Sequence, residues 1–174
     1  VAASRTVAAY EDEDALARFA DAVDVATYEF ENIPLPTVTF LAKRVTVRPG
    51  AKALGTAQDR ISEKQLARTL GAMTADFAGV DSLDELQARL RQVPPPCVLK
   101  TRRFGYDGKG QVKIRDIGEA VSAWEAIRGQ PAIVESLVPF RAEMSVIAAR
   151  SVSGDFRAWP VTENEHRNHI LHRS

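Results

Sequence analysis

The chain has 174 residues, of which 45% are hydrophobic and 26% are charged, so it has enough apolar residues for one ordinary globular domain or two small lobes. Lysine and arginine together number 23, as do aspartate and glutamate, and the net charge near pH 7 is zero. This balance argues against a broad charged surface for nucleic acid or a membrane, and no apolar run approaches the length of a membrane span. The single cysteine, Cys97, excludes a disulfide framework, and we expect it as a buried side chain in a reducing, cytoplasmic setting.

Helices and strands alternate in the first part of the chain. The patterns predict a helix capped by Asp12 or Asp14, a strand over residues 25–30, a short helix opened by Pro34 and Pro36 and running through Leu41, and a strand over residues 44–48. On the first of these helices one face is apolar and carries Leu16, Phe19, Ala20 and Val23. A domain of βα type is therefore expected to finish near Pro49.

A second unit follows, with a different order of elements. The patterns predict a helix over 57–70 that Gly71 stops, an extended segment over 73–77, a helix from the Ser82 capping box to about 91, strands over 97–100 and 112–114, a helix over 120–127 and a strand over 132–135. Two further strands are expected over 144–150 and 156–161, joined by a turn at 153–155. The chain is thus predicted to be an α/β protein with α+β lobes. Because it starts at Val1 without a methionine and stops at Ser174 soon after a strand, we expect an internal part of a longer protein.

The stretch from Lys100 to Gln111 joins an apolar strand to a basic loop with three glycines. Glycine lets backbone N–H groups approach a ligand, and the basic side chains offer cations to oxyanions. These side chains are Lys100, Arg102, Arg103 and Lys109. A strand follows the loop where a P-loop or a dinucleotide fold needs a helix, so the pattern favours a flap over a nucleotide. A basic surface hairpin without a ligand is the alternative.

Two glutamates flank an apolar bend downstream of this loop. A strand edge can meet a purine through backbone groups, and a carboxylate suits ribose hydroxyls. On this interpretation Glu135 and Val138 serve the base and Glu143 serves the ribose. The alternative is that Glu135 simply ends a strand and Glu143 is solvated.

Several short motifs run in order along nearly the whole chain from about Asp24. They are Thr27-Tyr28-Glu29-Phe30-Glu31-Asn32-Ile33-Pro34, Ala57-Gln58-Asp59-Arg60 with Lys64, Lys100-Thr101-Arg102-Arg103, Gly105-Tyr106-Asp107-Gly108-Lys109-Gly110-Gln111, Glu135 through Val138, Glu143 with Ser145, and Glu163-Asn164-Glu165-His166. This set resembles the 5-(carboxyamino)imidazole ribonucleotide synthases, which are ATP-dependent carboxylases of purine biosynthesis with the ATP-grasp fold. The resemblance implies a partial ATP-grasp domain over 48–174, preceded over 1–47 by the end of a Rossmann-like pre-ATP-grasp domain.

The resemblance also assigns site residues. It implies Lys100 and Lys109 as catalytic residues. The residues implied to bind ATP are Arg60, Lys100, Gly105, Tyr106, Asp107, Gly108, Lys109, Gly110, Gln111, Glu135, Ser136, Leu137, Val138, Glu143 and His166. For His166, which stands near His169 and His172, a solvent-facing loop histidine is the alternative.

The ribonucleotide substrate is implied to contact Tyr106 and Lys109 in the loop and Glu29 or Glu31 in the first domain. Tyr28 to Glu31 alternates as a strand does, which would place both glutamates on one side. The sequence departs from the family at Phe104, where the family usually has a glycine. We expect this bulky residue to stiffen the flap or to require a negative φ.

The reaction implied by the resemblance has two steps. ATP phosphorylates bicarbonate to carboxyphosphate, and the exocyclic amine of 5-aminoimidazole ribonucleotide then takes the carboxyl group, leaving ADP and phosphate. Mg²⁺ is expected with ATP, its ligands beyond Ser174, with none in this chain, and the family likeness suggests a homodimer. Alternatives are another ATP-grasp carboxylase or ligase, and a non-catalytic module that binds nucleotides or other anions.

Overall fold

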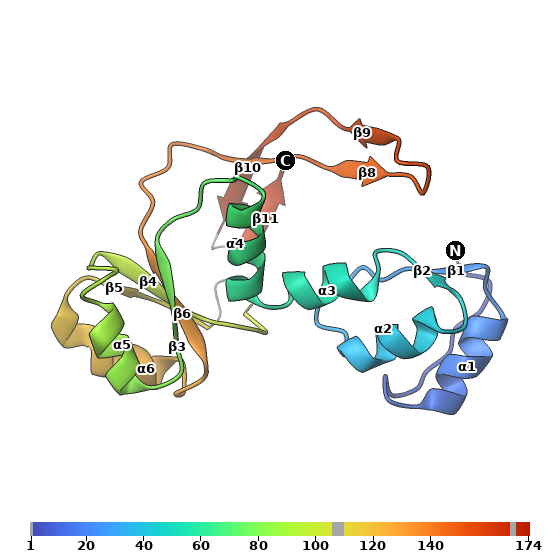
Figure 1. Cartoon of the computed structure of the whole chain (residues 1–174), viewed down its shortest axis with the longest axis horizontal. Coiled ribbons are helices and arrows are strands. Elements are labelled where there is room, and N and C mark those ends of the chain that lie inside the picture. Colours follow the sequence, from blue (N-terminus) through green and yellow to red (C-terminus); the bar gives the residue numbers. More distant parts are fainter. Residues whose placement is uncertain (1, 106–109, 168–169) are drawn as a thin grey trace.

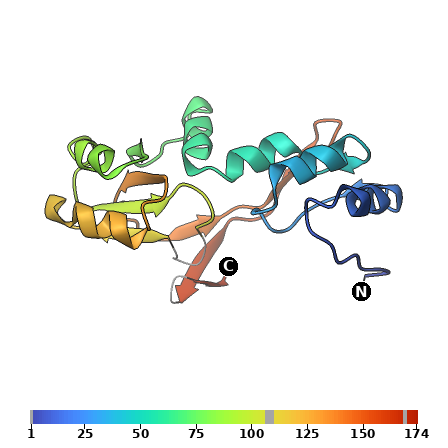
Figure 2. The same cartoon turned by 90° about the horizontal axis from the view of Figure 1, so that it is seen from below.

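The computed structural model describes residues 2–105, 110–167 and 170–174. Two units lie at opposite ends of the long axis, with helices α3 (Ala51–Ala57) and α4 (Arg60–Thr69) between them (Figures 1 and 2). The first unit contains the N-terminal helices, and the second is built on a four-stranded sheet. Among the described residues, no helix combines the length and apolar character needed to cross a membrane.

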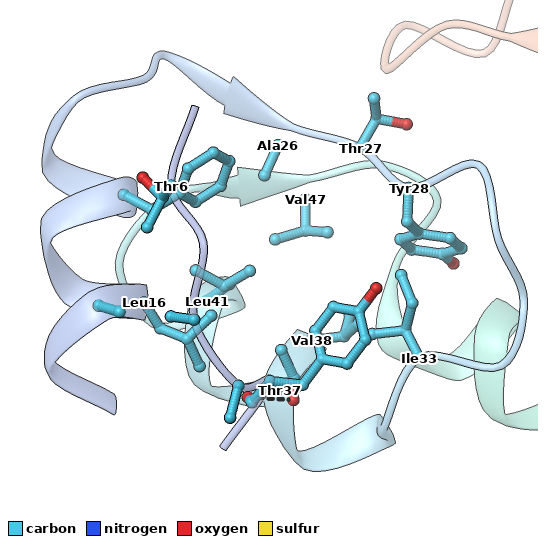
Figure 3. Close-up of a pocket in the computed structure, with 15 residues that line it drawn as sticks. Thr6, Leu16, Ala26, Thr27, Tyr28, Ile33, Thr37, Val38, Leu41 and Val47 are labelled. Atoms are coloured by element: carbon cyan, nitrogen blue, oxygen red, sulfur yellow. Dashed lines mark hydrogen bonds between the residues drawn. The ribbon is translucent and has the colours of Figure 1, made fainter. Parts of the chain in front are cut away.

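The first unit consists of α1 (Glu13–Asp21), β1 (Val25–Ala26), α2 (Leu35–Ala42) and β2 (Thr46–Val47), and the two strands pair in parallel. The predicted cap is confirmed, because Asp12 accepts a hydrogen bond from the Ala15 N–H at 2.9 Å. Its apolar core gathers side chains from every element, including α3: Ala20, Ala26, Val38, Leu41, Val47 and Leu54. Beside this core lies a cavity of about 310 Å³ (Figure 3), whose lining side chains carry no charge.

Both strands of the first unit are shorter than predicted. The strand expected over 25–30 ends at Ala26, and the one expected over 44–48 covers only 46–47. Each of these strands has a two-residue parallel partner, so the alternating residues 28–31 have no ladder along which to extend. The Gln58 side chain instead donates to the carbonyls of Glu31 and Ile33, at 2.7 and 2.6 Å.

The helix predicted over 57–70 is in fact two helices. Asp59 adopts an extended conformation, with φ −122° and ψ 108°, and caps α4, so α3 ends at Ala57 and α4 starts at Arg60. The predicted stop at Gly71 is confirmed, and its φ of +83° is the left-handed conformation that glycine adopts freely after a helix.

The sheet of the second unit has the order β3-β6-β4-β5 and is antiparallel throughout. Its strands are β3 (Phe77–Val80), β4 (Cys97–Thr101), β5 (Gln111–Ile114) and β6 (Ala132–Ser136). The two strands predicted on either side of the glycine-rich loop are confirmed, and they pair with each other as an antiparallel hairpin, β4 with β5. The first strand begins at Phe77 rather than ending there, because residues 77–80 are the ones that pair with β6.

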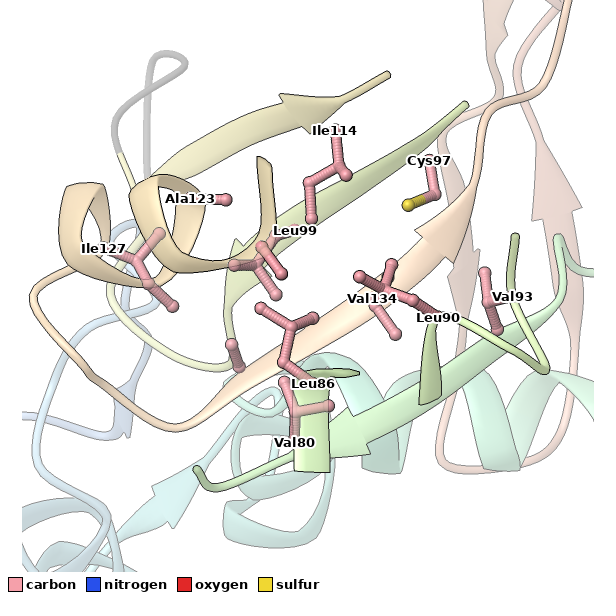
Figure 4. Packing of buried hydrophobic residues seen from close by; sticks show 12 residues of the cluster. Val80, Leu86, Leu90, Val93, Cys97, Leu99, Ile114, Ala123, Ile127 and Val134 are labelled. Atoms are coloured by element: carbon pink, nitrogen blue, oxygen red, sulfur yellow. The ribbon is translucent and has the colours of Figure 1, made fainter. Parts of the chain in front are cut away.

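Helices α5 (Leu83–Arg89) and α6 (Ala120–Ala126), the latter preceded by the 3₁₀ turn η1 (Ile117–Glu119), cover one face of this sheet. The predicted cap of α5 is confirmed, since the Ser82 hydroxyl accepts from the Glu85 N–H. Between helices and sheet lies a core of fully buried side chains (Figure 4), which includes Val80, Leu86, Leu90, Cys97, Leu99, Ile114, Ala123, Ile127 and Val134. Because side chains alternate along a strand, the residues between these core positions face the other side of the sheet.

The C-terminal strands are β7 (Glu143–Ser145), β8 (Ala148–Arg150), β9 (Phe156–Ala158), β10 (Thr162–Arg167) and β11 (Ile170–Arg173). The strand predicted over 144–150 is divided, because residues 143–145 pair with β10 and residues 148–150 pair with β9. The strand predicted over 156–161 ends at residue 158. The predicted turn is confirmed, with Gly154 at φ +95°.

Candidate functional site

A cleft of about 850 Å³ lies on the sheet face opposite α5 and α6. On β4, Cys97, Leu99 and Thr101 are buried toward the helices, so Val98 and Lys100 face the cleft. Gln111 reaches the same cleft from β5, paired directly with Lys100. Glu135 reaches it from β6, paired with Val98. The three strands therefore bring Lys100, Gln111 and Glu135 together, as the sequence-based site requires.

Two lysines share the Glu135 carboxylate at the wall of this cleft. Lys100 Nζ donates to Glu135 Oε2 at 2.9 Å, and Lys64 Nζ of α4 lies 3.6 Å from Oε1. The Glu135 side chain is 8% exposed, which strengthens both interactions relative to a surface ion pair. Two positive groups face one negative group here, so the cluster keeps an excess positive charge that suits an anionic ligand.

The residues at the end of β6 and just after it lie along the rim of the cleft. Ser136, Leu137 and Val138 line it together with Phe140. The Ser136 N–H donates to the Asp76 carbonyl at 2.9 Å, and the Leu137 N–H donates to Pro96 at 3.2 Å. These bonds fix the strand end, while the Leu137 and Val138 side chains stay exposed.

The glycine-rich loop starts and ends at the far end of β4 and β5. Arg60, the first residue of α4, donates through Nη2 to the Gly105 carbonyl at 3.3 Å, and the Thr101 N–H donates to the Gly110 carbonyl at 2.7 Å. The predicted ligands Tyr106, Asp107, Gly108 and Lys109 lie outside the described residues.

Phe104 precedes this loop in the left-handed conformation, with φ +60°. The expectation of a negative φ is therefore wrong. The turn by which the chain leaves β4 requires a positive φ at this position, a conformation that glycine adopts more easily than a bulky residue. The side chain is 68% exposed.

A buried carboxylate holds the start of the loop to α4. Asp59 is 3% exposed and accepts hydrogen bonds from the Ile61 and Ser62 N–H groups at 3.0 and 3.2 Å. Arg102 Nε lies 2.8 Å from Asp59 Oδ2, and Arg103 Nε lies 3.5 Å from it. Burial would raise the pKa of this carboxyl, but the bonds from Arg102, Ser62 and Ile61 and the charge of Arg102 outweigh it, so the pKa lies below 3.8.

Glu143 and His166 come together on a different sheet. Asn164 of β10 is paired with Glu143 of β7, and His166 Nε2 lies 3.3 Å from Glu143 Oε1. Asn164 Nδ2 donates to Ser145 Oγ at 2.7 Å and to Glu143 Oε1 at 3.3 Å. His166 thus lies on a strand and not in a loop, and it lies beside the predicted ribose ligand.

Glu29 and Glu31 lie in the exposed segment between β1 and α2. They are not on a strand, so the expected shared strand face is wrong, although the Gln58 contacts hold the Glu31–Ile33 backbone near the start of α4. The cavity of the same unit is lined by Tyr28 and Ile33 on either side of them, but neither glutamate lines it (Figure 3).

Cys97 is fully buried, as expected, and burial raises the pKa of its thiol to about 11. A thiol with this pKa is protonated and unreactive near neutral pH. Within the described ranges, no three His, Cys, Asp or Glu side chains are grouped so as to hold a metal ion.

Lys64 and Asp59 are site residues to which the sequence reasoning assigned no role. Both belong to the motif Ala57-Gln58-Asp59-Arg60 with Lys64. Lys64 follows Arg60 by four residues, and this spacing places both cations on one face of a helix. The sequence could have marked Asp59 only as a residue that caps a helix. Because one unbroken helix was expected over 57–70, no helix start was expected at this position.

Comparison with known proteins shows which family the chain resembles. The sequence model of the ATP-grasp domain matches residues 65–174, and that of the ribonucleotide synthetase preATP-grasp domain matches residues 1–58. The chain is 42% identical to the N5-carboxyaminoimidazole ribonucleotide synthase of Pseudomonas aeruginosa over 93% of its length, and 45% identical to that of Brucella melitensis over 98%. These alignments cover 45% and 48% of the two relatives, so the chain spans about half the length of the curated relatives it matches.

A solved structure shares the fold. The ADP complex of an N5-carboxyaminoimidazole ribonucleotide synthetase superposes with a TM-score of 0.89 at 39% identity, over 95% of this chain and 44% of that one. The predicted fold is therefore confirmed. The domain match covers well over half of the 174 residues, and the chain belongs to the ATP-grasp family.

Proposed function

We propose that this chain is the nucleotide-binding part of an enzyme that carboxylates 5-aminoimidazole ribonucleotide with bicarbonate and ATP, releasing ADP and phosphate. The observation that carries the proposal is the position of Lys100. It lies in a cleft of about 850 Å³, 2.9 Å from a buried glutamate and on the strand that leads into the glycine-rich loop. That volume is within the range of about 300–1,000 Å³ typical of small-molecule sites.

Charge supports ATP as the ligand of this cleft. The Lys64–Glu135–Lys100 cluster has one more positive group than negative, and Arg60 adds a cation at the start of the loop. In the proposal Lys100 turns from Glu135 toward phosphate oxygens, and Lys64 keeps the buried carboxylate neutralised when it does. The strand end through Val138 meets the adenine by backbone groups, and Glu143 and His166 hold the ribose side of the nucleotide.

The remaining assignments follow the same proposal. Gly105, Gly110, Gln111 and the loop between them cover the phosphates and keep water from the carboxyphosphate, which hydrolyses readily. Tyr106 and Lys109, with Glu29 or Glu31, contact the ribonucleotide, and Lys100 and Lys109 act on the transferred phosphoryl group. Catalysis of this kind needs positioning and charge stabilisation but no protein nucleophile.

The proposal extends to the setting of the enzyme. ATP would act with Mg²⁺, which neutralises phosphate charge in reactions of this class, and its ligands would lie beyond Ser174. We further propose a cytoplasmic homodimer and a domain boundary near residue 47, as expected from the family resemblance.

The test is ADP release by a version of this chain extended to the length of its relatives. ATP, Mg²⁺ and bicarbonate are supplied with and without 5-aminoimidazole ribonucleotide. We expect strong stimulation by the ribonucleotide, lost in Lys100→Ala and retained in Lys52→Ala, an exposed lysine of α3. ATP binding without stimulation would contradict the acceptor and require a different substrate.

A further inference from the structure

We propose that Asp59 is a positioning residue, which holds the start of the glycine-rich loop and the first turn of α4 in the arrangement that binds the phosphates of ATP. The proposal rests on the proposed function. It assigns to this carboxylate a task beyond capping a helix, and the carboxylate itself does not contact the nucleotide.

Asp59 connects two segments that are far apart in the sequence. One oxygen, Oδ1, accepts from Ile61 and Ser62 in the first turn of α4. Both oxygens lie within 2.9 Å of Arg102 Nε, on the segment that leaves β4. The backbone continues the same connection, because the Arg60 N–H donates to the Arg102 carbonyl at 3.2 Å.

The two connected segments carry the proposed phosphate ligands. Helix α4 carries Arg60 and, one turn later, Lys64, which reaches Glu135 in the cleft. The β4 segment carries Lys100 and continues to Gly105, whose carbonyl accepts from the Arg60 guanidinium. A shift of α4 relative to β4 would therefore move Arg60 and Lys64 away from Lys100 and would release the loop start.

The charge of Asp59, and not only its hydrogen-bonding capacity, is needed for this. A cap requires an acceptor oxygen, which asparagine also supplies. Only a carboxylate compensates a guanidinium at 2.8 Å, and the 3% exposure of Asp59 leaves little water to replace it. The interaction also raises the pKa of Arg102, mainly through its hydrogen bond to Asp59.

Gln58, which precedes Asp59 in the sequence, connects a third segment, residues 31–33, to the break between α3 and α4. Gln58 donates to the carbonyls of Glu31 and Ile33. The short break between α3 and α4 thus contacts the proposed ribonucleotide segment through Gln58 and the proposed phosphate loop through Asp59.

Asp59→Asn tests the inference in the chain extended to the length of its relatives, with dissociation constants for ATP and for AMP as the readout. ATP depends on the phosphate ligands that Asp59 positions, whereas AMP depends mainly on the base and ribose contacts. We expect the preference for ATP over AMP to fall about tenfold, because misplaced ligands lose charge-assisted bonds. The dissociation constant for AMP should stay within about twofold of that of the parent protein.

Asp12→Asn is the matched control, since Asp12 caps α1 by the same kind of bond in the other unit. It should leave the ATP preference unchanged. If Asp59→Asn lowers the melting temperature but not the preference, Asp59 is only a helix cap and the inference is wrong.

A second variant decides the matter if Asp59→Asn does not fold. Arg102→Gln removes the nearer of the two guanidinium partners of Asp59, since Arg103 lies at 3.5 Å, and leaves the cap intact, so it should lower the preference for ATP as well. An unchanged preference in that variant would overturn the inference. A parent protein that binds AMP but shows no preference for ATP would instead contradict the proposed function.

Discussion

Phe104 is one of two non-glycine residues with a positive φ in the part of the chain that the structure describes, the other being Arg128. The φ of +60° at Phe104 places a bulky side chain in the left-handed region, and the side chain is 68% exposed, so few contacts offset the strain. The left-handed conformation costs a non-glycine residue about 1–2 kcal/mol. The start of the loop therefore stores strain that a glycine would not have.

Phe104→Gly should raise the free energy of unfolding by about 0.5–1 kcal/mol, since relief of strain exceeds the entropy cost of glycine. Urea unfolding measures this change. Phe30→Gly is the control, because Phe30 is also an exposed phenylalanine outside regular structure but has no positive φ, and it should not stabilise. A destabilised Phe104→Gly would show that the side chain makes contacts that matter more than the strain.

Cys97 allows a second prediction about a single residue. Its pKa of about 11 compares with 9.0 for an ordinary thiol, so near pH 7 the folded protein should have about a hundredfold less thiolate than the unfolded chain. Iodoacetamide should modify Cys97 at least about a hundredfold more slowly in native buffer than in denaturing urea. Equal rates would mean that β4 opens readily.

At the level of elements, the hairpin of β4 and β5 determines where the loop begins and ends. Gly110 closes it at φ +69°, and a Cβ added there would lie 2.6 Å from Thr101 Oγ1. Thr101 is buried and its N–H is bonded to the Gly110 carbonyl, so neither residue can move away easily.

Gly110→Ala should therefore lower the free energy of unfolding by about 2 kcal/mol or more, through strain and overlap together. Chemical denaturation measures it. Gly50→Ala is the matched control, because Gly50 has an ordinary φ of −80° and nothing within 4 Å of an added Cβ. Similar stabilities for both variants would contradict this account of the hairpin.

The sequence predicted those elements whose signal is local. Strands β4, β5 and β6 have either alternating apolar and polar residues or a continuous apolar run. Ser82 and Asp12 are typical residues at helix starts, and Gly71 is typical of a helix end. The predictions are wrong where the extent of a strand depends on pairing with a segment far away in the sequence. The strand expected over 25–30 lacks a neighbour after Ala26, and β7 and β8 separate because each pairs with a different strand.

The same distinction applies to the site. Lys100, Gln111 and Glu135 were expected together, and the strand register places them in one cleft. Lys64 and Glu135 are 71 positions apart in the sequence, and Asp59 and Arg102 are 43 positions apart. No local sequence pattern predicts contacts over such separations. Only the family motifs marked that part of the chain.

At the level of the whole molecule, two apolar cores lie in separate units, and the residues around Asp59 connect them. The pKa of Asp59 is lowered in the folded protein relative to 3.8. The stabilising effect of its ionised form is therefore complete above that value and is lost as the pH falls through the folded pKa.

Acid unfolding tests this contribution. Between about pH 5 and pH 2 the parent should lose more unfolding free energy than Asp59→Asn, whose side chain does not titrate. Asp12→Asn should follow the parent, since it leaves Asp59 in place. Parallel curves for the parent and Asp59→Asn would contradict the lowered pKa.

The most direct test of the central claim is the affinity for ATP of Lys100→Ala, measured by calorimetry beside the parent and Lys52→Ala in the chain extended to the length of its relatives. Loss of a charge-assisted bond to phosphate is worth about 1.5–3 kcal/mol, so the dissociation constant should rise about tenfold or more. Lys52→Ala should bind as the parent does. An unchanged affinity in folded Lys100→Ala would show that the cleft between β4 and β6 does not hold the phosphates of ATP.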